Sequence, residues 1–176
     1  MPSPTFFQFC KEMLDRYEND ERIGMIAGFN HDDVTTDVDS DYFFTGNLSI
    51  WGWASWARVV NNWEGDYAFW TNDESRNKML SVIKDRRMRN EYERIVSDHA
   101  SSGKAFFESI FLASMIMQNR LAIVPRVNMI KNVGADPNST HFSSTFETMP
   151  SRLRQIFTMP VHDLQWPLRH SRYVVD

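Results

Sequence analysis

The sequence predicts an α/β fold in which residues 1–176 form a single domain. Short apolar runs typical of buried strands alternate with segments whose apolar residues recur at helical spacing. No internal repeat and no linker rich in glycine, proline or serine divides the chain. A length of 176 residues is enough for a domain with a substantial hydrophobic core.

The first helix is expected to begin at Ser3, a residue type that often caps helices, with Pro4 in the first helical position. Residues 19–21 end this helix, and Cys10 lies on its apolar side as a small core residue. Because Cys10 is the only cysteine, an intrachain disulfide and a cysteine-rich metal site are excluded.

The apolar pattern predicts strands at residues 22–29 and 42–44 and a helix at residues 54–63. A longer helix is expected to begin near Thr71, which forms a capping-box pair with Glu74.

A break at residues 101–103 ends the longer helix. Residues 104–119 then predict a helix that is apolar almost all round, a pattern typical of a buried helix. Strands are expected at residues 121–124 and 128–133, and a short helix at residues 151–157.

The composition limits the kinds of partner. Six tryptophans, thirteen phenylalanines and five tyrosines suit a core, a sugar-binding cleft or an interface. The net charge of -4 gives no electrostatic reason to expect nucleic-acid binding. No apolar run reaches membrane-spanning length and the start is not a signal peptide, so a cytoplasmic protein is expected.

An acidic loop contains Asp37, Asp39 and Asp41, a spacing that imitates the start of a calcium loop. The required glycine and glutamate are replaced by Tyr42 and Leu48. The same aspartates imitate an Asp-x-Asp metal motif but lie in mid-loop, so we interpret them as a solvated loop.

The aromatic segment that includes Trp51, Gly52, Trp53 and Trp56 offers flat apolar rings separated by small residues. Such rings can stack on the apolar faces of sugars, and they can equally fill a buried turn between a strand and a helix.

Two ionisable residues are further candidates. Glu108 is the only acid in the apolar helix, where partial desolvation would raise its pKa and suit it to act as a base. Alternatively, Glu108 is a first-turn glutamate that points outward. His141 is either a surface residue or a metal ligand that needs carboxylates from elsewhere.

Four segments in this order resemble a family of bacterial nucleotide-sugar glycosyltransferases of the GT-A type, which are distantly similar to N-acetylglucosaminyltransferases. The resemblance covers nearly the whole chain, from Pro2 to about His170. It is carried by Pro2-Ser3-Pro4-Thr5-Phe6-Phe7, by Ala27-Gly28-Phe29-Asn30, by Tyr42-Phe43-Phe44 with Trp51-Gly52-Trp53-Ala54-Ser55-Trp56-Ala57-Arg58, and by Ala122-Ile123-Val124-Pro125 to Gly134 with Ser139-Thr140-His141.

The resemblance implies a sugar transferase that uses a nucleotide-sugar donor, a glycan acceptor and a divalent metal, Mn or Mg. Glu108 would be the catalytic base for inverting attack, although the family more often has Asp after Trp at this position. His141 would approach the metal or the diphosphate, and the segment from Trp51 to Trp56 would border the sugars.

The family's acidic metal motif and nucleotide-binding half would stand before Pro2, so the resemblance implies a partial GT-A α/β/α sandwich that lacks its N-terminal half. A fragment, a natural truncation and a partner of a separate chain are all compatible with this expectation. The chain alone would then have no metal clamp and bind no metal, whereas the complete enzyme would use one. Its uncovered surfaces predict a homo-oligomer. The alternative function is a non-catalytic glycan-binding or assembly module.

Overall fold

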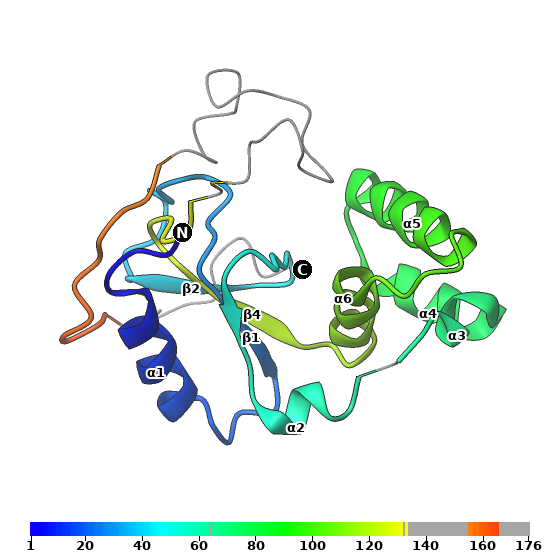
Figure 1. Cartoon of the computed structure of the whole chain (residues 1–176), viewed down its shortest axis with the longest axis horizontal. Coiled ribbons are helices and arrows are strands. Elements are labelled where there is room, and N and C mark those ends of the chain that lie inside the picture. Colours follow the sequence, from blue (N-terminus) through cyan, green and yellow to red (C-terminus); the bar gives the residue numbers. More distant parts are fainter. Residues whose placement is uncertain (64, 132, 134–154, 166–176) are drawn as a thin grey trace.

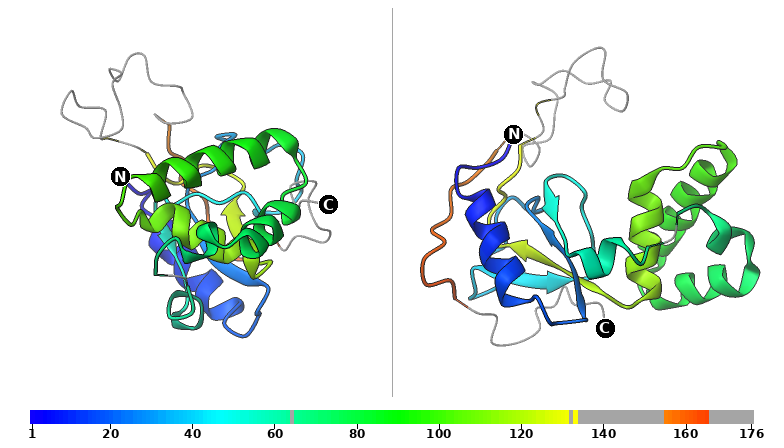
Figure 2. Two further views of the ribbon diagram at one scale, coloured as in Figure 1. Left: turned by 90° about the vertical axis from the view of Figure 1, so that its right-hand side faces the viewer. Right: turned by 60° about the horizontal axis from the view of Figure 1, so that its bottom comes forward.

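The structure is a computed structural model that describes residues 1–63, 65–131, 133 and 155–165. Its elements form two groups that meet at one helix (Figure 1). One group is a small sheet with a helix against it, and the other is a set of helices. Figure 2 shows the helical group on one side of the molecule, with the sheet between it and the first helix.

The sheet has four strands in the order β2-β4-β1-β3. β1 and β4 are parallel, with Ile26 opposite Ile123, and both edge strands are antiparallel to their neighbours. The mixed sheet confirms the predicted α/β class. The strands are β1 (Ile23–Ala27), β2 (Tyr42–Thr45), β3 (Trp53–Ala54) and β4 (Leu121–Pro125).

The predicted strand at residues 128–133 is not formed as such. Within the described part of this stretch, only Ile130 makes a β-bridge, to Pro2. The predicted short helix at residues 151–157 falls mostly outside the described residues.

Helix α1 (Phe6–Arg16) begins two residues later than predicted, with Thr5 instead of Ser3 as its N-cap residue. Ser3 does not cap it because the backbone N–H of Ser3 donates a hydrogen bond to the Met129 carbonyl (2.8 Å), which holds Ser3 in an extended segment. Cys10 is buried on the inner side of α1, as predicted.

The region after β3 contains more and shorter helices than expected. They are α2 (Ala57–Val60), α3 (Ala68–Thr71), α4 (Asp73–Val82) and α5 (Arg86–Ser101). The predicted helix over residues 54–63 is reduced to α2 because its first residue belongs to β3.

The predicted long helix from Thr71 is two helices, each with its own cap. Thr71 ends α3, and its hydroxyl donates to the Ala68 carbonyl (3.0 Å), so it cannot cap the next helix. Asn72 caps α4 by accepting from the Ser75 N–H (2.9 Å), and Asp85 caps α5.

Helix α6 (Phe107–Met117) is the buried helix that the sequence predicts. Phe111 and Met115 pack into the core of the sheet, whereas Ala113 and Ile116 pack into the core of α3, α4 and α5. A helix between two cores has no polar face, which explains why its sequence is apolar all round.

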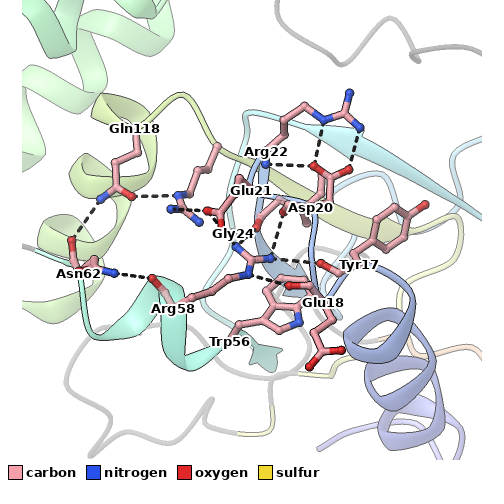
Figure 3. Close-up of polar contacts among 12 residues, drawn as sticks. Tyr17, Glu18, Asp20, Glu21, Arg22, Gly24, Trp56, Arg58, Asn62 and Gln118 are labelled. Atoms are coloured by element: carbon pink, nitrogen blue, oxygen red, sulfur yellow. Dashed lines mark hydrogen bonds and ion pairs between the residues drawn. The ribbon is translucent and has the colours of Figure 1, made fainter.

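Arg58 holds the end of α1 and the start of β1 together (Figure 3). Its guanidinium donates to the backbone carbonyls of Tyr17, Glu18, Asp20 and Ile23 at 2.9 to 3.2 Å. The rigid, planar fork of donors in a guanidinium lets one side chain satisfy several carbonyls of a turn. This contact fixes α2, and with it the aromatic segment that precedes α2.

Candidate active site

A cavity of about 710 Å³ lies between the sheet and the helices α5 and α6. Its volume is in the range of ordinary small-molecule sites. The sheet side contributes Phe29, His31, Asn47, Leu48, Ser49, Ile50 and Trp51; α5 contributes Met88, Glu91, Tyr92, Ile95 and Val96; and α6 contributes Glu108, Ser109 and Leu112.

The sheet side of the cavity is formed by rings at the carboxyl end of β1. Phe29 and His31 lie in the segment after β1, and the Phe29 ring contacts both the His31 ring and the Trp51 ring with centroids 4.9 Å apart. The carboxyl ends of parallel strands are the usual place for ligand sites in α/β sheets. β1 and β4 are parallel, so the cavity lies where this rule places a site.

Gly52 sets the position of Trp51. Its φ of 62° lies in the left-handed region, and a Cβ atom there would overlap the side chain of Ile130. The Gly52 carbonyl also accepts a hydrogen bond from the Gly28 N–H (2.8 Å). Glycine therefore lets the aromatic segment turn closely over the end of β1.

The helix side of the cavity carries two carboxylates. Glu91 is exposed on α5, and Glu108 is half-buried in the first turn of α6, where the helix N-terminus favours negative charge. Among the described residues, neither carboxylate has a hydrogen-bond or ion-pair partner. Tyr92 of α5 lines the same cavity; burial, together with the charge of Glu91, raises the pKa of its hydroxyl, which therefore stays protonated.

Ser109 ties the start of α6 to its neighbours. Its hydroxyl lies 2.7 Å from the Tyr67 hydroxyl and 2.9 Å from His99 Nδ1. The side chain of Ser109 is buried, so these bonds form away from water. They hold the helical turn that carries Glu108.

The structure brings together two of the residues predicted as functional. Trp51 and Glu108, which are far apart in the sequence, line the same cavity, and Gly52 lies next to Trp51. His141 lies outside the described residues.

Trp53 and Trp56 lie elsewhere and do not line this cavity. The Trp53 ring packs against Phe107 and Phe111 of α6, with centroids 6.4 and 5.1 Å away. Trp56 is buried, and its Nε1 donates to the Leu14 carbonyl (3.0 Å). These contacts give both residues a packing role between the helices and the sheet.

Sequence reasoning did not single out Phe29, His31 or Glu91. The available signal was the face of α5: Met88, Tyr92 and Ile95 recur at helical spacing, and Glu91 stands at the edge of that face.

The described residues do not by themselves form a divalent-metal site. No group of three His, Cys, Asp or Glu side chains in this part of the chain could hold a metal ion. In the acidic loop, Asp37 and Asp39 are exposed, and the Asp41 carboxylate accepts a hydrogen bond from the Gln165 N–H (2.8 Å).

No helix in the described ranges is both long enough and apolar enough to cross a lipid bilayer. No protein-family model, curated protein or solved structure matches this chain.

Proposed function

We propose that the chain is the acceptor-binding part of a sugar transferase, built on a scaffold related to the GT-A class, with Glu108 as the general base. The observation that carries this proposal is the shared cavity: an aromatic ring, Trp51, and a carboxylate, Glu108, line one cavity of saccharide size. Aromatic rings bind the apolar faces of sugars, and a carboxylate can accept a hydroxyl proton.

In the proposed reaction, the acceptor hydroxyl loses its proton to the Glu108 carboxylate. The acceptor oxygen forms a bond to the anomeric carbon of a nucleotide-sugar, while the bond from that carbon to the diphosphate oxygen breaks. A nucleoside diphosphate leaves, and the configuration at the anomeric carbon is inverted. The network of Ser109, Tyr67 and His99 would hold Glu108 in place during this step.

A second candidate is a glycan-binding module without catalysis. The mainly apolar lining around Trp51 supports it, because stacking of a sugar on an aromatic ring needs no ionised group. Both candidates require saccharide binding at Trp51, and only the first requires the carboxylate of Glu108 for turnover.

Saccharide binding is tested first, by saturation-transfer NMR with a panel of oligosaccharides followed by calorimetry. Trp51→Ala should weaken binding about tenfold, the equivalent of about 1.4 kcal/mol of stacking. Trp70→Ala is the matched control, because Trp70 packs near Arg76 in the helical group and lies outside the cavity. If no saccharide binds at millimolar concentration, both candidates fall.

Turnover is tested on the full encoded protein with nucleotide-sugar donors and a bound saccharide as acceptor. Glu108→Gln should reduce transfer by at least about 100-fold, the usual contribution of a general base, with saccharide binding retained. Glu74→Gln, which changes a first-turn glutamate of α4, should leave transfer unchanged. Equal activity of the Glu108→Gln and wild-type proteins would remove Glu108 from the mechanism, and binding without any turnover would favour the non-catalytic module.

A further inference from the structure

Apart from His31, the described lining of the cavity carries charge only on carboxylates. Glu91 and Glu108 are both acidic, and no lysine or arginine is among the described residues of the lining. Neither carboxylate is neutralised by a partner in the described part of the chain. The nearby walls are mainly apolar, for example Ile95 and Leu112, and weaken the screening that water would otherwise provide.

The opposite wall suits a positive charge as well. Phe29 and Trp51 form an edge-to-face pair at 4.9 Å, and Trp51 is half-buried in the lining. The face of an aromatic ring attracts ammonium groups, and tryptophan does so most strongly. The protonated hydroxyl of Tyr92 has no hydrogen-bond partner among the described residues and can serve a ligand.

An anionic ligand would be repelled by the carboxylates of this cavity. A nucleoside diphosphate would bring negative charge toward two carboxylates and would find no cationic Lys or Arg side chain in the described lining. The described lining therefore favours the saccharide that receives the sugar over the diphosphate of the donor.

From these observations we infer that the cavity selects saccharides that carry a protonated amine, bound between the carboxylates of Glu91 and Glu108 and the ring of Trp51. The inference rests on the proposed saccharide-binding function and specifies its substrate class.

The test compares three β-1,4-linked oligosaccharides of equal length that differ only at carbon 2 of each ring. These are glucosamine, N-acetylglucosamine and glucose oligomers, which carry an amine, an amide and a hydroxyl. Dissociation constants are measured by calorimetry at a pH at which the amines are protonated. We expect the amine oligomer to bind about tenfold more tightly than either neutral one, and the difference to shrink in high salt.

Variants locate the source of the preference. Glu91→Gln and Glu108→Gln should each lower the preference for the amine about threefold, and the double variant should abolish it while still binding neutral oligomers. Glu93→Gln is the matched control: it removes the same charge from the exposed face of α5, outside the cavity, and should leave the preference unchanged. Circular dichroism confirms that each variant is folded.

The outcomes separate this inference from the proposed function. Equal binding of all three oligomers, or an amine preference that survives in the double variant, overturns the inference and leaves saccharide binding intact. Competition between a nucleoside diphosphate and the bound amine oligomer would also overturn it. Failure of every oligomer to bind overturns the proposed function itself.

Discussion

Replacement of Arg58 by alanine should be among the most destabilising single changes in the sheet group. The guanidinium makes four hydrogen bonds to backbone carbonyls, and it also lies 4.6 Å from the centroid of the Trp56 ring. A net contribution of about 0.5–1.5 kcal/mol per bond gives about 2–6 kcal/mol in total. Water can reach the turn once the side chain is removed, so we expect about 3 kcal/mol.

The assay is urea unfolding followed by far-UV circular dichroism, with the loss read from the transition midpoint at constant slope. Arg58→Lys should recover less than half of the loss, because a single ammonium cannot reach the carbonyls that a planar fork spans. Arg22→Ala is the control. In the described part of the chain the Arg22 side chain bonds only the Asp20 carboxylate, it is 75% exposed, and its loss should cost under about 1 kcal/mol. A loss for Arg58→Ala no larger than that of Arg22→Ala would refute the reasoning.

Two further predictions concern stability. Gly52→Ala should lower the free energy of unfolding by about 2 kcal/mol and weaken saccharide binding, because the new side chain has a positive φ, overlaps Ile130 and displaces Trp51. Gly103→Ala is the control, with a similar φ but open space, and should cost only about 1 kcal/mol. Equal losses of stability in urea unfolding would show that the overlap with Ile130 does not matter. Burial raises the pKa of the Cys10 thiol from 9.0 to about 12. Below pH 9 the stabilisation from the buried, protonated Cys10 thiol is fully present. Above pH 9 the thiol of the unfolded chain loses its proton while that of the folded chain keeps it, so the free energy of unfolding should fall by up to about 1.4 kcal/mol per pH unit until pH 12. Cys10→Ala should flatten this fall in unfolding measured from pH 8 to 10.5, and parallel slopes would contradict the assignment.

Elements dominated by burial were predictable from the sequence. β1, β2, β4 and α6 lie close to their predicted positions because continuous apolar segments must leave water wherever the chain folds. The helix caps were not predictable, because several polar residues near each helix start could act as the cap. Thr71 and Ser3 are suitable in type, but tertiary contacts assign their backbones to other elements.

The candidate site was predictable only in its separate parts. Trp51 and Glu108 stand out by residue type, but their convergence depends on how α6 packs against the sheet, which local pattern does not encode. Glu91 looked like an ordinary exposed residue of an amphipathic helix, since exposure on α5 alone does not reveal a cavity on that side.

Helix α6 also has a consequence for how this chain can change over time. A typical helix keeps an outer face on which substitutions are nearly neutral, whereas residues 110–116 of α6 face one core or the other along most of their length. A larger side chain on one side shifts the helix against the other side, and the shift carries the turn that holds Glu108 with it. The width of the cavity therefore depends on the packing of both cores at once. Substitutions in α5 and in the segment at residues 47–51 can change ligand preference without disturbing either core.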